Sequence, residues 1–147
     1  MKWSSCAAAF AMGVLMLCST GCRTAGALDG AENGAVSWRN GVMVRQAMLD
    51  DNPYNRQYKV GVPMSEVRFI TIHNTWNDAP AQNERDYLNN RRDNESISFH
   101  YAVDENEALQ IIPHYYCAWH AGDGRGPGNT ASIGIEICRS RCVGKDE

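Results

Sequence analysis

The chain has 147 residues, of which 44% are hydrophobic and 21% are charged, and its formal net charge at pH 7 is -3. This length allows one globular domain at most, and the composition argues against a disordered chain. Because the charge balance is slightly acidic, with no broad basic field, the composition also argues against nucleic acid as the main partner.

The first 22 residues differ from the rest and are predicted to be a signal peptide. Lys2 is the only charged residue among them, and residues 7–17 form an apolar run. That run is shorter than the roughly 20 residues of a membrane-spanning helix, but it fits the apolar region of a secretory signal. The Ser-Thr-Gly-Cys segment at 19–22 resembles a lipoprotein signal, in which Cys22 would carry a lipid that attaches the protein to a membrane. Alternatively, Ala-Gly-Ala at 25–27 suits ordinary cleavage. We therefore expect export, as a membrane-anchored lipoprotein or as a periplasmic or extracellular protein.

The six cysteines do not define a disulfide framework. Half of them lie in or beside the leader, so an odd number remains in the body of the chain: Cys117, Cys138 and Cys142. One bridge could form among these three in an oxidising compartment, and the sequence does not say which pair would make it. Because the sequence contains no CxxC pair, we do not expect a structural zinc ribbon.

The segment after the leader is predicted to be a linker that precedes a domain. Residues 23–41 are rich in Gly, Ala, Asn and Asp, which favours a tether, and the domain is expected over 42–147. Within the domain, residues 42–49 are predicted to form a short helix or an edge segment, and residues 54–64 are predicted to be irregular.

A buried central strand is predicted over residues 67–74. It contains the run Phe-Ile-Thr-Ile-His-Asn, which is rich in β-branched residues, and it would bring His73 to the rim of a sheet. A helix should follow from 80 to about 92, because proline is tolerated in the first turn of a helix. We expect Tyr87 and Leu88 to face inward from this helix.

The second half of the chain predicts further strands. Residues 98–112 alternate on both sides of a polar turn, which indicates a hairpin. Residues 121–131 form a glycine-dense loop, and 132–138 alternate again as a strand. Several strands with one clear helix indicate a mixed α/β fold, with a small central β-sheet flanked by helices.

Glu136 is the residue that gives His73 a candidate partner. It lies within Ile-Gly-Ile-Glu-Ile, and its strand face is shared with Gly134 and Cys138. A carboxylate is costly to bury there unless it is paired or functional. Beside a bound metal it could serve as the base that deprotonates a coordinated water. The alternatives are a solvated edge strand for Glu136 and a purely structural role for His73.

The remaining histidines have less specific surroundings. His120 follows Trp119 at the mouth of the glycine loop, where it could bind a substrate, polarise a carbonyl or cap the loop through a hydrogen bond. We interpret His100, on a strand face opposite apolar residues, as structural or as a residue that supports a site residue from behind. His114 follows a proline at a strand exit and is expected to be exposed.

Four motifs follow one another along the chain: Ile-His-Asn-Thr at 72–75, Ser-Phe-His-Tyr-Ala-Val-Asp at 98–104, Ala-Trp-His-Ala-Gly-Asp-Gly at 118–124 and Ser-Ile-Gly-Ile-Glu-Ile-Cys at 132–138. In this order they resemble the zinc-dependent type 2 N-acetylmuramoyl-L-alanine amidases, relatives of the peptidoglycan recognition proteins and of phage endolysin amidases. The likeness extends over about residues 42–140.

The resemblance implies a reaction and a role for each candidate residue. Members of the family hydrolyse the amide between N-acetylmuramic acid and the L-alanine of the stem peptide, so peptidoglycan would be the partner. His73 matches the first zinc ligand, Glu136 the acidic residue that activates the zinc-bound water, and His120 a cleft histidine near the substrate. Zinc would polarise the scissile carbonyl and lower the pKa of its bound water to about 7.

The resemblance also predicts an incomplete zinc site. In the family, a histidine and then a cysteine or aspartate follow a long helix beyond the strand that carries Glu136, and residues 139–147 do not match that segment. Since catalytic zinc needs three protein ligands, we expect a domain that is incomplete at its C-terminus. The alternatives to an active amidase are a non-catalytic peptidoglycan-binding module and an inactive fragment with an exposed sheet face.

Overall fold

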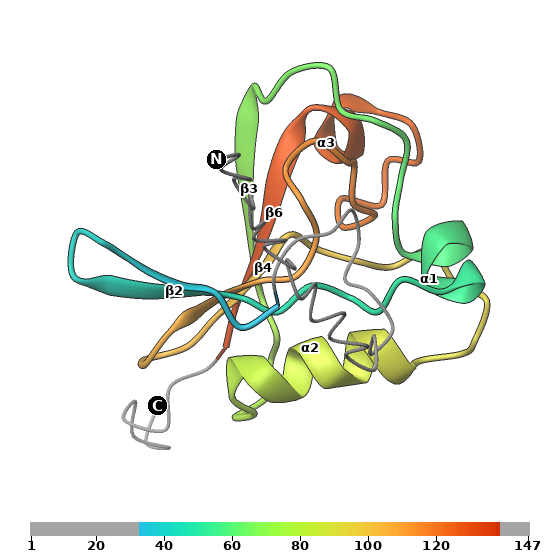
Figure 1. Ribbon diagram of the computed structural model, residues 1–147. Helices are drawn as coiled ribbons and strands as arrows, with labels where there is room; N and C mark the ends of the chain where they lie inside the picture. The colour runs from blue at the N-terminus through green and yellow to red at the C-terminus, as the bar shows by residue number, and fades with distance from the viewer. Residues whose placement is uncertain (1–32, 139–147) are drawn as a thin grey trace, which may run out of the picture.

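The computed structural model describes residues 33–138. In this part of the chain, strands and helices are arranged around one sheet with the strand order β1-β2-β5-β4-β6-β3 (Figure 1). The strands are β1 (Val36–Arg39), β2 (Val42–Gln46), β3 (Phe69–Asn74), β4 (Tyr101–Val103), β5 (Ala108–Gln110) and β6 (Ser132–Ile137). The helices are α1 (Pro53–Tyr58), α2 (Ala81–Asn90) and α3 (Pro127–Thr130). The expected mixed α/β class is therefore confirmed.

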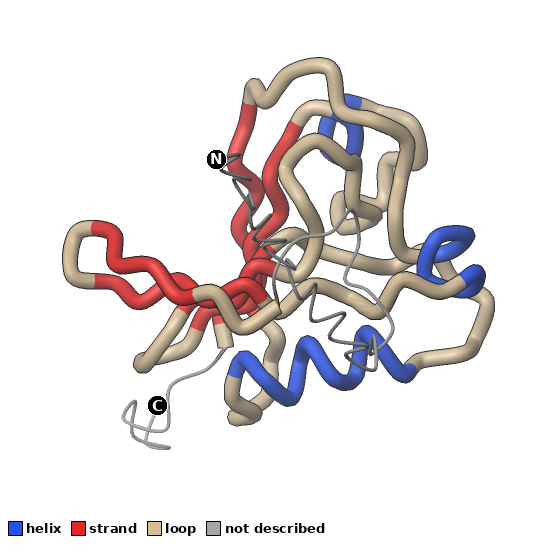
Figure 2. The backbone as a smooth tube through the Cα atoms, in the orientation of Figure 1, coloured by secondary structure: helices blue, strands red, loops and turns tan. Residues whose placement is uncertain are grey.

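The sheet combines two antiparallel hairpins with parallel pairings. β1 pairs with β2 and β4 with β5 in antiparallel fashion, so the predicted hairpin at 98–112 is confirmed in β4 and β5. β2 with β5, β4 with β6 and β3 with β6 are parallel pairs. Figure 2 shows the β1–β2 hairpin projecting from one end of the sheet, away from the helices.

The helix α2 covers β4 and β5 with one apolar face. Ala81 and Leu88, seven positions apart and therefore on the same side of a helix, are buried at 0% and 1% exposure. The inward position of Leu88 is thus confirmed. Tyr87 is 61% exposed, so the prediction that it also faces inward is wrong. Neighbouring helical residues are separated by about 100° around the axis, and the buried stripe passes through Leu88 rather than Tyr87.

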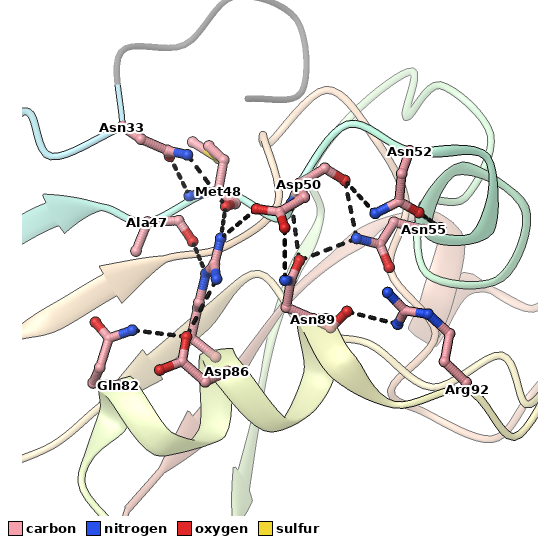
Figure 3. Close-up of polar contacts among 11 residues, drawn as sticks. Asn33, Ala47, Met48, Asp50, Asn52, Asn55, Gln82, Asp86, Asn89 and Arg92 are labelled. Atoms are coloured by element: carbon pink, nitrogen blue, oxygen red, sulfur yellow. Dashed lines mark hydrogen bonds and ion pairs between the residues drawn. The ribbon is translucent and has the colours of Figure 1, made fainter. Parts of the chain in front are cut away.

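Polar contacts attach α2 to the segment between β2 and α1 (Figure 3). Asn89 Oδ1 accepts hydrogen bonds from Asp50 N at 2.9 Å and from Asn55 Nδ2 at 3.1 Å, and Asn89 Nδ2 donates to Asp50 Oδ2 at 2.9 Å. Arg85 Nε donates to the carbonyl oxygen of Ala47 at 3.1 Å. Since Asn55 and Asn89 are buried, these bonds replace those that the Asn89 side chain and Asn55 Nδ2 lose to water, whereas Asn55 Oδ1 has no partner among the described residues.

The strand β3 lies at the edge of the sheet, which corrects the prediction of a buried central strand. In the described residues it pairs with β6 on one side, and Ile70 and Ile72 are 66% and 67% exposed. An apolar β-branched run identifies a strand, but its position in the sheet depends on pairing partners that are distant in sequence. The outer face of β3 is therefore an exposed apolar surface.

Two local elements correct other expectations. Residues 54–64 were expected to be irregular, but α1 begins at Pro53, with the side chain of Asn52 accepting a hydrogen bond from Asn55 N at 2.9 Å. An asparagine cap followed by proline is a helix start signal. The strand β1 lies within the predicted linker at 23–41. Asn40 and Gly41, which follow it, adopt positive φ angles of 50° and 83° and close a two-residue hairpin turn.

Several expectations concern residues outside the described range, including the signal peptide, Cys22 and Cys142. Within that range, Cys117 and Cys138 are buried free thiols and do not form a disulfide with each other. The described helices all fall short of the length and apolar character that crossing a membrane requires.

Candidate active site

His73 and Glu136 lie beside each other on the two parallel strands β3 and β6. The sheet register pairs these two residues directly. Side chains at paired positions of neighbouring strands point to the same face of the sheet, and strands are about 4.8 Å apart. Both side chains are partly buried. The structure therefore brings the predicted imidazole and the predicted carboxylate to one face.

His120 reaches this face from the loop that follows Trp119. Its Nδ1 lies 3.3 Å from Nε2 of His73, and the two rings meet edge to face with their centroids 5.4 Å apart. The ring packs over Gly134, where a Cβ atom would stand only 2.5 Å from His120 Cδ2. A glycine at this position of β6 thus makes room for His120 to reach His73.

The contacts of Ser132 assign a tautomer to His120. Its Oγ donates to the carbonyl oxygen of Gly128 at 2.8 Å, so it acts as an acceptor toward His120 Nε2, 3.4 Å away. With its proton on Nε2, neutral His120 uses Nδ1 to accept from His73 Nε2. In this assignment His73 Nε2 is the donor of the 3.3 Å contact.

The ionisation of the site follows from its partial burial. Desolvation, together with the nearby charge of Glu84, raises the pKa of Glu136 to about 6. Glu136 is therefore mostly ionised at pH 7 but has appreciable affinity for a proton. Burial, and to a lesser extent the neighbouring His73, lowers the pKa of His120, which favours the neutral ring.

His100 supports the site from below and is fully buried. The backbone N–H of Gly134 donates to its Nδ1 at 3.0 Å, so its Nε2 carries the proton and donates to the carbonyl oxygen of Tyr116 at 2.9 Å. Burial lowers the pKa of His100 to about 4. These contacts agree with the structural interpretation of His100. His114 is exposed, as expected, and lies 2.6 Å from the hydroxyl of Tyr101.

A pocket of about 530 Å³ opens next to His120. Its walls come from the segment before β4 and from the glycine-dense loop: Ser96, Ile97, Trp119, His120, Gly122, Gly124, Arg125 and Asn129. Part of this loop, expected to be without regular structure, forms the short helix α3. His120 thus borders both the pocket and the His73–Glu136 pair.

Residues 63–146 match the family described as N-acetylmuramoyl-L-alanine amidase. The chain belongs to this family. It is 57% identical over 76 residues to the N-acetylmuramoyl-L-alanine amidase CwlA of a Bacillus species. The matched stretch covers 51% of this chain and 30% of the relative. It is 53% identical over 77 residues to the N-acetylmuramoyl-L-alanine amidase XlyB of Bacillus subtilis. This second match covers 52% of this chain and 24% of the relative.

Solved structures of the family share the fold. PlyL is similar with a TM-score of 0.60 and 43% identity, covering 69% of this chain and 61% of the PlyL chain. The catalytic domain of XlyA is similar with a TM-score of 0.57 and 38% identity, covering 66% of this chain and 61% of that domain. The chain spans less than a third of the length of the curated relatives named above.

The described residues do not fit a complete catalytic zinc site. Within residues 33–138, no group of three His, Cys, Asp or Glu side chains is placed to hold a metal ion. A catalytic zinc requires three protein ligands and an open position. A zinc ion bound by His73, as the family resemblance implies, would therefore need further ligands from outside this range.

Two residues of the site were not predicted from the sequence. Ser132 orients His120, and Asn129 accepts hydrogen bonds from the backbone N–H groups of His120 and Ala121, each at 2.8 Å. Ser132 shares its strand face with Glu136 at the period of two, so the alternation of β6 could have identified it. Asn129 had no comparable signal, because its partners depend on how the loop folds.

Proposed function

We propose that this chain forms the amidase domain of a peptidoglycan hydrolase that cleaves the amide between N-acetylmuramic acid and the L-alanine of the stem peptide. Membership of the family and the similarity to the catalytic domain of XlyA support the proposal. The observation that carries it is the register pair of His73 and Glu136 on parallel strands, with His120 in contact with His73 at the edge of a pocket.

In this proposal Glu136 is the general base. It takes a proton from a water molecule while the water oxygen attacks the carbonyl carbon of the lactyl group, and the C–N bond to L-alanine breaks. The proton then passes to the departing amino group, so that the products are a carboxylic acid and an amine. His120, at the mouth of the pocket, binds the substrate beside Glu136.

We propose zinc as the cofactor and His73 as one of its ligands, on the basis of the family resemblance. Because the described residues do not complete a zinc site, the proton transfers above use the chain's own groups alone. The incomplete zinc site of the described residues also favours a second candidate function, in which the domain binds peptidoglycan without cleaving it.

Cleavage, binding and metal content of the full chain separate the two functions. Stem peptide released from purified peptidoglycan would be quantified by mass spectrometry, binding by co-sedimentation with the insoluble wall, and zinc by elemental analysis. Zinc together with peptide release supports the amidase. Binding with neither zinc nor release supports the recognition module, and the absence of both binding and release contradicts both functions.

Glu136→Gln tests the general base, with Glu105→Gln as the control. Both substitutions remove one carboxylate, but Glu105 is exposed in the turn between β4 and β5. Loss of a general base typically costs about 10²–10⁴-fold in rate. We expect Glu136→Gln to lower peptide release at least a hundred-fold with unchanged wall binding, and Glu105→Gln to behave as wild type. Full activity of Glu136→Gln would contradict the assigned role.

We also propose that residues 1–22 direct export, that residues from 23 link this signal to the domain, and that Cys22 receives the lipid. Metabolic labelling with a fatty-acid analogue tests lipidation. We expect incorporation into the wild type and none into Cys22→Ser. Equal labelling of the two proteins, or no labelling of either, would contradict lipidation at Cys22.

A further inference from the structure

We propose that Trp76 is a saccharide-binding residue, on which a pyranose ring of the glycan strand stacks beside the His73–Glu136 pair. The inference rests on the proposed function, because it takes a glycan-linked peptide as the substrate. It adds a specificity-determining residue to the site, and it concerns the sugar that lies on the other side of the scissile amide from the peptide.

Trp76 presents a large apolar side chain to solvent from a backbone conformation that tryptophan rarely adopts. The side chain is 79% exposed, the highest value among the large hydrophobic residues of the range 33–138. Its φ angle is 56°, whereas the other non-glycine residues with positive φ in that range are Asn40 and Asn94. Asparagine tolerates this region, but a bulky residue there is an outlier. Such strained residues cluster at ligand-binding sites, where the surrounding structure holds the side chain in place.

Trp76 follows β3 at its carboxyl end, whereas the pocket lies toward the amino end of the same strands. The glycine-dense loop, which lines the pocket, leads into β6 at Ser132, and Ser132 pairs with Phe69 at the start of β3. Figure 1 shows α3 near this end of the two strands and the start of α2 near the other. The Cα atoms of His73 and Trp76 are within roughly 11 Å of each other, because three residues of extended chain span no more. Trp76 is therefore outside the pocket and close enough to His73 for one bound substrate to reach both.

The loop that carries Trp76 is held by hydrogen bonds at both of its ends. Asn74 Oδ1 accepts from the backbone N–H of Trp76 at 2.7 Å, and Asn77 Oδ1 accepts from that of Ala79 at 2.8 Å. Asn77 Nδ2 donates to Glu84 Oε1 on α2 at 2.8 Å. These bonds attach the loop to α2, so a ligand meets the indole without first having to order this segment.

The groups around the indole suit an uncharged sugar. Trp76 is flanked by the hydroxyl and amide side chains of Thr75 and Asn77, and Asn74 Nδ2 has no acceptor within residues 33–138. Such groups can bond to the hydroxyl and acetamido groups of a saccharide. The C–H face of a pyranose ring carries a partial positive charge, which complements the negative face of an indole. The carboxylate of Glu84 disfavours an anion at this place, whereas it does not repel a neutral ring.

Isothermal titration of the full chain with two probes tests the inference. One probe is the disaccharide of N-acetylglucosamine and N-acetylmuramic acid, with its lactyl group capped as a methylamide so that it is uncharged. The other probe is the free stem peptide that begins with L-alanine. The proteins are the wild type, Trp76→Asn, which tolerates the positive φ, Trp76→Tyr, which keeps an aromatic ring, and Trp38→Asn. Trp38 is 68% exposed on β1, so its variant removes an exposed indole outside the site. Circular dichroism verifies that each variant is folded.

We expect Trp76→Asn to weaken binding of the disaccharide about three- to ten-fold, the effect of one aromatic stacking contact, and to leave binding of the peptide unchanged. Trp76→Tyr should keep most of the affinity, and Trp38→Asn should match wild type. Equal losses for both probes, no loss for the disaccharide, or a wild type that does not bind the disaccharide would overturn the inference. The proposed function stands in each of these cases if the wild type releases stem peptide from peptidoglycan. If the folded wild type binds neither probe and releases no peptide, both fail.

Discussion

Gly134 lies directly beneath the imidazole of His120, with room for a hydrogen but not for a methyl group. A Cβ atom there would stand 2.5 Å from both Cγ and Cδ2 of the ring. Since Gly134 belongs to a regular strand and His120 to a loop, the strand dictates where the loop histidine rests. The contact between His120 and His73 therefore depends on a missing side chain in β6.

Gly134→Ala should displace His120 and destabilise the protein by about 1–3 kcal/mol, the usual cost of overpacking a filled site. Urea unfolding measures the loss, and titration with muropeptide measures the effect on binding. The matched test is the double variant Gly134→Ala/His120→Ala, compared with His120→Ala alone. If the ring is the obstacle, the alanine at 134 should cost much less once the ring is absent. Equal costs in the two backgrounds would contradict the proposed clash.

Asn89 should contribute far more to stability than its neighbour Asn90. Asn89→Ala removes one of the two acceptors of the buried Asn55 Nδ2 and the side-chain acceptor of the backbone N–H of Asp50, at an expected cost of about 2–3 kcal/mol. Asn90 is exposed on the same last turn of α2, and alanine there should be neutral or slightly stabilising. Thermal unfolding of the two variants checks this. Similar melting temperatures would show that the polar attachment of α2 contributes little.

The exposed edge strand β3 should promote self-association. Ile72→Lys places a charge on this edge, which proteins commonly use to prevent edge-to-edge pairing. We expect less association in sedimentation velocity at high protein concentration, with the free energy of unfolding changed by less than about 1 kcal/mol. Val62→Lys, also at an exposed apolar position but outside the sheet, serves as the control and should not change association. An unchanged sedimentation profile for Ile72→Lys would exclude β3 as the contact.

Stability should fall as the solution becomes acidic, because His100 is held neutral in the folded protein. Its pKa is about 4 when folded, against 6.5 for the unfolded side chain, so the unfolded state takes up the proton first as pH decreases. Between pH 7.5 and pH 5 this difference should remove about 2 kcal/mol from the free energy of unfolding. The lowered pKa values of His114 and His120 act in the same direction.

The raised pKa of Glu136 opposes this trend, because the folded state binds that proton more tightly than the unfolded state. Urea unfolding should therefore be measured at several pH values in the Glu136→Gln background, which removes the opposing contribution of Glu136. A stability that is constant or increases from pH 7.5 to pH 5 in this background would contradict the buried neutral state of His100.

The sequence by itself determined the elements whose signals are local. Alternation identified the β4–β5 hairpin and β6, the proline indicated where α2 begins, and the motifs around His73 and Glu136 indicated the family. These features depend on residues close together in the chain, so a period or a turn signal is sufficient to find them.

The tertiary structure decided everything that depends on partners distant in sequence. It placed β3 at the edge rather than in the centre of the sheet, paired His73 with Glu136 in register, and positioned His120 over Gly134. The strand order and the fold of the glycine-dense loop arise from pairing and hydrogen bonding between separate segments. A hydrophobic pattern indicates that a strand has an apolar face, but it does not indicate which other segment packs on that face.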